Sequence, residues 1–571
     1  MFLVALTKDD IAQNFQSVKV EESLIHSLKV TIIVDKFLSD YISEPDGFSV
    51  IESPLINTPD LENIIFSKVA YNNKIDTISI FKSTLSGRPI YYHINSKGEF
   101  FCSTHISLLR TAGVPIEENL CALPEFFVFR FVMSPSTLYK DIFQLCAGDQ
   151  LQIKIKNNKA NLHKIYNYNP PKLNDKKNIN IITEQTIELL NNSIWGLNSR
   201  KNKMSVLLSG GLDSSILFRI CQQNFKTNTT FSTGFPFEDP KNDLEKDYSL
   251  SAANLFNTKH HFFDMTSNDY LQGFIESISK AEVPMHHLQS VPIYLLSHKI
   301  PETKNIVILG LGADDIFGTM SQYNLFRIEK NFILKLLAKY QQFFILKYLF
   351  TLNKSWQNYW YALENYNKST YSKTDISNLL WSIGVYGSIE WTSNYFNLTK
   401  KDIINGRYKE IIKFQNQSIY SMISMLLYLG SASTTQAIWS KLGESQKKIF
   451  YYPYTNIDLI NYAFSIPWDI KLEKPKNVLR LVAQQIEIPE KIINRPKSSF
   501  GIDPKQWAEK DGVFESVIPL ASKVFDEKEI RKMQSTEPKK AMTYWNMLNY
   551  AIWKRLCINN EPLNALLEEL K

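Results

Sequence analysis

The pattern of apolar and polar positions divides the chain into three stretches. Up to about residue 165, short alternating runs such as 78–81, 90–94, 100–103 and 150–155 are broken by turn residues, which is typical of a sheet-rich region. From about residue 180, helical periods alternate with short apolar runs, as in a parallel sheet with crossover helices. After about residue 320, the pattern predicts helices only, up to the end of the chain.

These stretches predict two domains, because 571 residues are too many for one ordinary domain. We assign residues 1–165 to the first domain and 181–571 to the second, with an aromatic-rich helical segment at about 320–440. Residues 166–180, rich in Asn, Pro and Lys, are the predicted linker. Residues 332–350 are apolar but carry three lysines at near-helical spacing, which favours an amphipathic helix over a membrane span.

Residues 204–215 (MSVLLSGGLDSS) combine a buried strand, a glycine corner and the start of a helix. Gly210 and Gly211 carry no Cβ, so the backbone can come close to an anion at this corner. The free N–H groups of the loop and of the helix N-terminus then point at that anion. Asp213 is expected beside the same pocket. A carboxylate near phosphates is unfavourable unless a cation binds to both, so its presence indicates a bound cation. The stretch predicts a pyrophosphate cradle with a Mg²⁺ ligand, and it is not a Walker loop.

The chain resembles the asparagine synthetase superfamily, enzymes that cleave ATP to AMP and pyrophosphate while they form an amide. The stretch 204–215 resembles the PP-loop of that family. Other segments that resemble it follow in the expected order, at residues 229–235, 247–261, 305–318, 452–454 and 495–501. The resemblance implies an α/β fold. An N-terminal α+β sandwich of the glutaminase (N-terminal nucleophile) type is followed by a doubly wound parallel-sheet PP-loop synthetase domain with a large helical C-terminal part.

The N-terminal stretch resembles the glutaminase-like domain of this family but lacks its nucleophile. The similar segments are residues 87–92, 101–103, 108–109, 137–139 and 147–149. In glutamine-dependent members the second residue is Cys, and processing exposes it as an N-terminal nucleophile. Here the second residue is Phe2, and the first cysteine, Cys102, falls inside a predicted strand. Glutamine hydrolysis is therefore not expected.

The resemblance also implies roles for individual residues. Asp213 and Asp314 are expected to hold Mg²⁺, which prefers carboxylate and phosphate oxygens. Lys497 and Asp213 are the expected catalytic residues, because a lysine can offset charge on phosphates and on an oxyanion. The expected ATP-binding residues are Leu207, Ser209, Gly210, Gly211, Asp213, Ser214, Thr233, Leu309, Gly310, Asp314 and Lys497.

Leu311 is an informative departure from the family pattern. Asparagine synthetases carry Glu at this place and β-lactam-forming relatives carry Tyr, whereas leucine can neither donate nor accept a proton. Plain asparagine synthesis is therefore not expected. The adjacent histidines at 260–261 and 286–287 have no third ligand at a plausible spacing, so no transition-metal site is expected.

The function expected from the sequence is an ATP-dependent, amide-forming synthetase without glutaminase activity. A carboxylate would attack ATP to give an acyl-adenylate and pyrophosphate, and an amine would then displace AMP. Leu311, the eroded N-terminal domain and the aromatic residues Trp356, Trp360, Trp381, Trp391 and Trp439 favour macrolactam formation in a lasso-type peptide. The alternatives are β-lactam formation, amidation of a small acid by ammonia or an amine, and a catalytically silent nucleotide-binding protein.

Composition narrows the choice of partners. A net charge of +7 is small for this length, so nucleic acid is not an expected partner. The five cysteines are scattered and form no CxxC pair, which is typical of reduced thiols. Because the N-terminal sequence also lacks the pattern of a secretion signal, a cytoplasmic location is expected. The expected partners are a peptide or small carboxylic acid, and, by resemblance to lasso systems, a precursor peptide with its protease and leader-binding protein. No membrane partner is expected.

Overall fold

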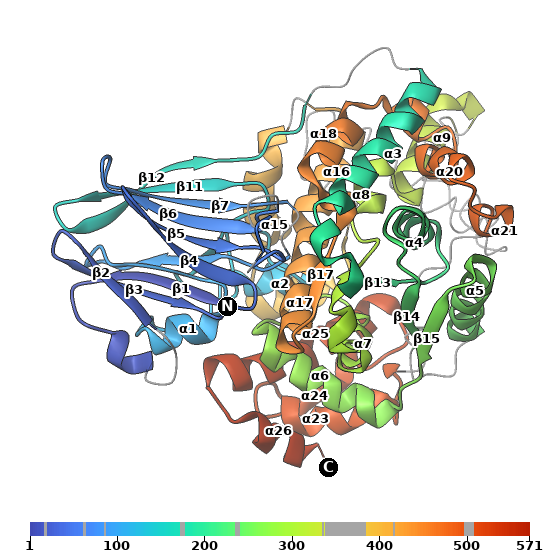
Figure 1. Ribbon diagram of the computed structural model, residues 1–571. Coiled ribbons are helices and arrows are strands. Elements are labelled where there is room, and N and C mark those ends of the chain that lie inside the picture. Colours follow the sequence, from blue (N-terminus) through green and yellow to red (C-terminus); the bar gives the residue numbers. More distant parts are fainter. Residues whose placement is uncertain are drawn as a thin grey trace.

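Two different layered structures make up the molecule. Figure 1 shows a β-sandwich at the N-terminal end of the chain, packed against a larger body of helices around a short parallel sheet. The computed structural model describes residues 1–15, 20–56, 58–60, 64–84, 87–171, 178–234, 240–333, 336, 384–414, 417–495 and 507–570. The expected amphipathic helix at 332–350 and Trp356, Trp360, Trp381 and Lys497 lie outside these residues, apart from 332, 333 and 336.

The sandwich consists of two six-stranded antiparallel sheets. One has the order β10-β8-β9-β1-β3-β2, formed by β1 (Phe2–Thr7), β2 (Val20–Ile25), β3 (Leu28–Val34), β8 (Tyr91–Ile94), β9 (Phe100–Ser103) and β10 (Phe143–Gln144). The other has the order β12-β11-β7-β6-β5-β4, formed by β4 (Ser39–Glu44), β5 (Gly47–Glu52), β6 (Ser67–Asn72), β7 (Thr77–Lys82), β11 (Gln150–Lys156) and β12 (Lys159–Tyr166). The expected strands at 78–81, 90–94, 100–103 and 150–155 are all present.

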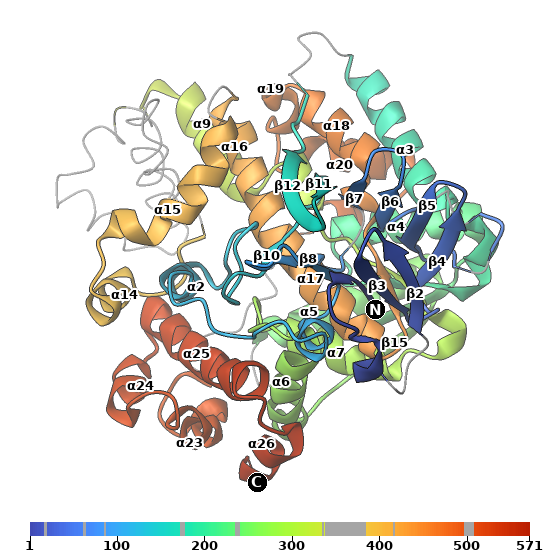
Figure 2. The ribbon, with the colours of Figure 1, turned by 90° about the vertical axis from the view of Figure 1, so that its left-hand side faces the viewer.

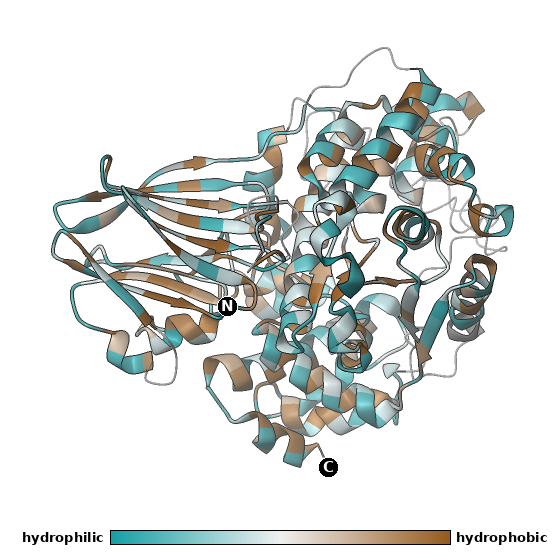
Figure 3. Cartoon of the chain, viewed as in Figure 1, coloured by the Kyte–Doolittle hydropathy of each residue, from teal (hydrophilic) through white to brown (hydrophobic). Residues whose placement is uncertain are grey.

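Strand β1 is buried on both faces. Phe2, Val4 and Leu6 face the second sheet, whereas Leu3 and Ala5 face a core shared with the helices. A strand covered on both sides needs no polar alternation, which explains the continuous apolar run at the start of the chain. Strands with one exposed face do alternate, and Figure 3 shows brown and teal residues along the sandwich strands. The sandwich is therefore joined to the helical body across β1.

The second layered structure is a five-stranded parallel sheet with the order β15-β14-β13-β16-β17. Its strands are β13 (Met204–Leu207), β14 (Thr229–Thr233), β15 (Lys259–Phe263), β16 (Ile306–Ile308) and β17 (Ile449–Tyr451). Ile306 and Ile308 enter one core, whereas Val307 enters another. Both faces are thus covered by helices, as in a doubly wound sheet. The fold class expected from the sequence is confirmed.

Strand β17 corrects the prediction that strands end near residue 320. It pairs in parallel with β16, with Phe450 opposite Val307. The strand has only three residues and lies between long helical stretches. A pattern this short does not distinguish a strand from a turn of helix. Its sheet position places Tyr452 and Tyr454, which follow it, near the ends of β13 and β16.

Helices cover the sheet and continue to the C-terminal end. Those that surround the sheet are α3 (Ile179–Trp195), α4 (Leu212–Phe225), α5 (Pro240–Phe256), α7 (Ser290–Lys299), α8 (Ala313–Phe317), α17 (Ser433–Ser445), α18 (Ile457–Ser465) and α20 (Asn477–Gln485). Others are α1 (Ile106–Thr111), α2 (Leu123–Phe129), α6 (Ser267–Ala281), α9 (Met320–Lys330), α14 (Ile389–Phe396), α15 (Lys400–Ile411), α16 (Ile419–Leu426), α19 (Trp468–Lys471), α21 (Glu490–Ile493), α23 (Ile518–Ala521), α24 (Glu527–Met533), α25 (Pro538–Trp553) and α26 (Leu563–Glu569). Figure 2 shows α23 to α26 gathered near the C-terminal end of the chain.

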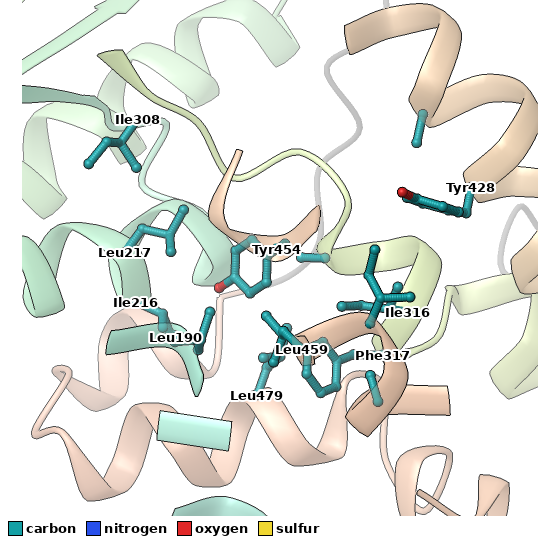
Figure 4. Close-up of a cluster of buried hydrophobic side chains, with 14 of the residues drawn as sticks. Leu190, Ile216, Leu217, Ile308, Ile316, Phe317, Tyr428, Tyr454, Leu459 and Leu479 are labelled. Carbon is teal, nitrogen blue, oxygen red and sulfur yellow. The ribbon is translucent and has the colours of Figure 1, made fainter. Parts of the chain in front are cut away.

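A large apolar core holds the helices against the sheet. Figure 4 shows Leu190 of α3, Ile216 of α4, Ile308 of β16, Leu459 of α18 and Leu479 of α20 turned toward one another. Each such side chain contributes roughly 1.5–3 kcal/mol on burial. The packing fixes α4 and α8, whose first turns carry the predicted Mg²⁺ ligands. Within the described ranges, no helix combines the length and apolarity needed to cross a membrane.

Candidate active site

The loop after β13 is closed by its own serines. The Ser209 hydroxyl accepts a hydrogen bond from the Gly211 N–H at 3.3 Å and lies 3.1 Å from the Ser214 hydroxyl. The Ser214 hydroxyl also contacts the Gly211 carbonyl at 3.2 Å. Gly211 is the N-cap of α4 and offers no capping side chain, so the first-turn N–H groups stay available for an anion.

The two glycines of the loop serve different purposes. Gly210 has a φ of +71°, and a Cβ there would lie 2.3 Å from the Tyr248 carbonyl oxygen of α5. Glycine is thus required because the loop packs against α5. At Gly211 a Cβ would meet only the Ser209 hydroxyl, at 3.3 Å, and this residue lines the cavity described below. Packing against α5 thus explains the glycine at position 210, and the approach of both glycines to an anion stays a prediction.

Asp213 and Asp314 meet although 101 residues separate them in sequence. They stand in the first turns of α4 and α8, which follow the paired parallel strands β13 and β16. Gly310 allows the two loops to approach, because a Cβ there would lie only 3.2 Å from the Ser214 nitrogen. The carboxyl ends of parallel strands thus bring both carboxylates to one place, as the sequence predicts.

Lys476 bridges these two carboxylates. Its Nζ lies 2.5 Å from Asp213 Oδ2 and 3.1 Å from Asp314 Oδ1. Burial disfavours the charged ammonium, but the two carboxylates outweigh it and raise the pKa of Lys476 above its ordinary value. The residue has a left-handed backbone (φ 54°) immediately before α20. The sequence analysis missed this lysine.

Two arginines add to the positive charge near the loop. Arg495 donates to the Ser209 carbonyl at 3.1 Å and to Glu245 at 2.7 Å, and its guanidinium stacks on the Tyr248 ring. Arg480 is held by the carbonyls of Pro475 and Ile493. The spacing of Lys476 and Arg480, four residues apart at the start of a helix, could have indicated a shared basic face.

A cavity of about 720 Å³ joins these groups. The predicted residues that line it are Leu207, Ser209, Gly211, Asp213, Ser214, Thr233, Leu309, Gly310 and Asp314. Gly210 is not among the lining residues, and Lys497 lies outside the described residues. The volume is within the range of about 300–1,000 Å³ that is usual for sites of small molecules and cofactors.

The side chains of the cavity fit Mg²⁺ and a triphosphate. Two carboxylates supply the hard oxygen ligands that Mg²⁺ prefers. The N-terminus of α4, Lys476, Arg480 and Arg495 supply positive charge for phosphate groups. Among the described residues, no three His, Cys, Asp or Glu side chains gather as a protein-only metal site. Phosphate oxygens would therefore complete the coordination.

The wall of the cavity formed by α7 and α17 has a different character. Its residues include Ile293 and Trp439, and Leu311 packs in the same apolar cluster. His287 precedes α7, and burial, followed by the charge of Arg130, lowers the pKa of its imidazole well below the ordinary value. This ring is neutral near pH 7. Among the described lining residues, all the charged ones come from outside this wall.

The other histidines and tryptophans that the sequence singles out have structural partners. The His260 ring lies 2.9 Å from the hydroxyls of both Thr230 and Ser232, so it joins neighbouring strands. His286 is buried and lies 3.0 Å from the Thr435 hydroxyl. Trp391 is 6% exposed in the apolar core, so it offers no gripping surface. Of the tryptophans named above, Trp439 reaches the cavity.

Buried charge occupies the sandwich where it meets α17. Arg88 is 1% exposed, and it forms ion pairs with Glu52 at 2.5 Å and with Glu444 of α17 at 2.7 Å. The α-amino group of Met1 also pairs with Glu444, at 2.8 Å. Phe2 is fully buried in β1, and burial raises the pKa of the Cys102 thiol in β9. A raised pKa disfavours the thiolate, which is the nucleophilic form of cysteine.

Two family models match the chain. The model of asparagine synthase matches residues 187–555, and the model of the glutamine amidotransferase domain matches residues 60–167. A putative asparagine synthetase [glutamine-hydrolyzing] 2 of Methanocaldococcus jannaschii is 26% identical over 47% of this chain and 51% of its own length. Asparagine synthetase [glutamine-hydrolyzing] 1 of Bacillus subtilis is 23% identical over 42% of this chain and 36% of its own length. The chain thus spans about half or less of the length of these relatives.

Proposed function

Since the chain belongs to the asparagine synthase family, we propose that it is an ATP-dependent amide ligase that activates a carboxylate as an acyl-adenylate. The observation that carries the proposal is the meeting of Asp213, Asp314 and Lys476 beside the open N-terminus of α4. Acidic and basic groups that converge at the ends of adjacent parallel strands suit a metal-bound triphosphate.

The residues of the site have distinct roles in this chemistry. Asp213 and Asp314 would hold Mg²⁺, which offsets charge on the phosphates when it is bound. The first-turn N–H groups of α4 would bind the pyrophosphate, and Lys476 would offset the charge that develops as it leaves. Leu207, Thr233 and Leu309 would contact the nucleoside. Lys497 keeps its expected catalytic role as part of the proposal.

The substrate that we propose is a peptide that is closed to a macrolactam, as in lasso peptides. The support is the uncharged wall with Leu311, Ile293 and Trp439. A free amino acid carries an ammonium and a carboxylate, and burying them without partners is costly. In a peptide these groups are amides, so only the reacting carboxyl and amine need to enter. A precursor peptide, its protease and its leader-binding protein would then be partners.

Two other kinds of function remain as alternatives. The first is amide formation on a small acid, either by ammonia or an amine or by closure to a β-lactam, and a small acid without further charge also suits the apolar wall. The second is a catalytically silent nucleotide-binding protein, which Leu311 favours because leucine supplies no acid or base to the reacting groups. The convergence of Asp213, Asp314 and Lys476 argues against an inactive protein, because these are the groups that phosphate chemistry needs.

Pyrophosphate release tests the proposal directly. The purified full chain is given ATP, Mg²⁺ and either linear peptides with a free N-terminal amine and an internal Asp or Glu, or small acids with ammonia. We expect release with a peptide and loss of one water from its mass. Asp213→Asn should lower the rate by a factor of roughly 100 or more. Asp315→Asn, a change of equal charge in the same turn as Asp314, should retain it.

Each outcome separates the alternatives. Release with small acids only would replace the macrolactam by a small amide. Binding of ATP without release in either panel, with the partner proteins added, would contradict the ligase and favour the silent protein.

A further inference from the structure

The four buried arginines of the described chain are not all paired. Arg88 pairs with Glu52 and Glu444, Arg407 with Glu125 at 2.9 Å, and Arg555 with Glu561 and Glu569. Arg130 is 6% exposed, and no carboxylate of the described residues pairs with it. Its Nε has no hydrogen-bond partner, and its guanidinium stacks on the Tyr386 ring with the centroid 3.4 Å away. A buried cation without an anion is costly, which raises the question of what balances it.

The backbone at Arg130 is left-handed, as it is at fifteen other non-glycine residues of the described chain. The residue follows the last turn of α2 with a φ of 68°, in the left-handed region, and its N–H donates to the Phe126 carbonyl. Glycine is the usual residue at this place of a helix end, because a Cβ is strained there. The chain therefore places a charged side chain where neither backbone nor burial favours one.

Arg130 lines a small cavity of about 60 Å³, whose other lining residues come from both the sandwich and the helical body. Phe126, Phe131 and Ile438 form apolar parts of its wall, and Lys441 of α17, whose charge is balanced by Glu282, also lines it. Since one water needs about 10–15 Å³ by this measure, the space suits a group of a few heavy atoms. The fork of a guanidinium matches a carboxylate in two parallel hydrogen bonds.

We infer that this cavity is a binding site for a short-chain monocarboxylate, of the size of acetate or propionate, held by Arg130. The carboxylate would balance the unpaired guanidinium, and the short apolar tail would contact the aromatic wall. The cavity shares no described lining residue with the larger cavity at the ends of β13 and β16, although the two adjoin at Thr434 and Thr435. The inference therefore does not depend on the proposed ligase activity.

Calorimetric titration of the full chain with sodium acetate and with sodium propionate, at constant ionic strength, tests the site. We expect saturable binding of one acetate per chain, weakened at least tenfold in Arg130→Gly. Glycine accepts the left-handed backbone, so this variant removes the cation while it preserves the helix end. Arg531→Met, which removes an exposed arginine, should bind like the wild type. Excess ATP should leave acetate binding unchanged.

Several results would overturn the inference. These are absent binding to the wild type, undiminished binding to Arg130→Gly, equal competition by chloride, or displacement of acetate by ATP. Circular dichroism shows whether the glycine variant is folded. If it is not, Arg130→Lys decides, because it keeps the charge but loses the fork. We expect weaker acetate binding to this variant, and equal affinity would contradict the assigned geometry.

Discussion

At the scale of single residues, Lys476 and a divalent cation compete for the same two carboxylates. The ammonium lies 2.5 Å from Asp213 and 3.1 Å from Asp314, so it occupies the place where Mg²⁺ is proposed to bind. In the absence of nucleotide, the lysine therefore opposes metal binding. Once phosphates are present, the same ammonium has a second anion to contact, and the carboxylates become available to the metal.

Lys476→Met is expected to raise the affinity for Mn²⁺ in the absence of ATP by roughly tenfold, since it removes the competing charge. The same variant should lose pyrophosphate release by a factor of about 100 because charge on the leaving group is no longer offset. Electron paramagnetic resonance of free Mn²⁺ measures the first effect. Lys474→Met, an exposed lysine two residues away, is the control. Unchanged or weaker Mn²⁺ binding by Lys476→Met would show that the lysine does not mask the site.

The residues of the site differ in how far the sequence predicts them. The serines, Gly211 and Asp213 could be predicted because one local pattern carries them. The contact of Lys476 with Asp213 could not be predicted, because the two residues lie 263 positions apart, and the spacing of Lys476 to Arg480 indicates at most a shared basic face. The contact of Gly210 with α5 was not predicted, since it is also a long-range feature.

At the scale of elements, α17 connects the nucleotide cavity to the sandwich. Trp439 lines the cavity, and two residues further Lys441 forms an ion pair with Glu282. The Glu282 carboxylate also accepts hydrogen bonds from the N–H groups of Ile106 and Ser107, at the start of α1. Burial would raise the pKa of Glu282, but Lys441 and these donors lower it to about 2, from 4.5. This carboxylate therefore joins α1, α17 and the end of α6.

Glu282→Gln is expected to lower the free energy of unfolding by about 3–5 kcal/mol, because Lys441 stays buried without its anion. A depressed folded pKa means that the stabilisation is complete above pH 4.5 and is lost as the pH falls toward 2. The difference between wild type and variant, measured by urea unfolding, should therefore shrink between these values. Glu527→Gln, which breaks an exposed pair with Arg531, should cost less than about 1 kcal/mol. A pH-independent difference would contradict the assignment.

Helices and strands could be predicted where the pattern of apolar and polar positions is long or repeated. The strands β7, β8, β9 and β11 were expected. Buried and exposed positions alternate in β7 and β11, whereas β8 and β9 are short buried runs bounded by turn residues. Strand β17 has three residues and owes its conformation to pairing with β16, so the sequence around it indicated helix. The spatial order of the parallel strands was not predicted, because it depends on pairings between distant segments, such as that of β13 with β16, rather than on any local pattern.

At the scale of the whole molecule, the sandwich and the helical body share their buried charges. Arg88 belongs to the sandwich and Glu444 to α17, and both are almost fully buried. Glu52 completes the cluster from β5, with its carboxylate 2.5 Å from Arg88. Charges that are buried only in the joined state make separation of the two parts costly. The two parts are therefore expected to unfold together.

Arg88→Met tests this coupling. The change leaves the carboxylates of Glu52 and Glu444 buried without their shared cation, and we expect a loss of about 3–5 kcal/mol. Because the cluster spans both parts, scanning calorimetry should show one transition in the wild type, and the variant should shift all of it to lower temperature. Arg531→Met, which removes an exposed arginine with two carboxylate partners, should shift the midpoint little. Two separate transitions, of which only the first moves in Arg88→Met, would mean that the sandwich is stable without α17 and that the buried cluster does not couple the two parts.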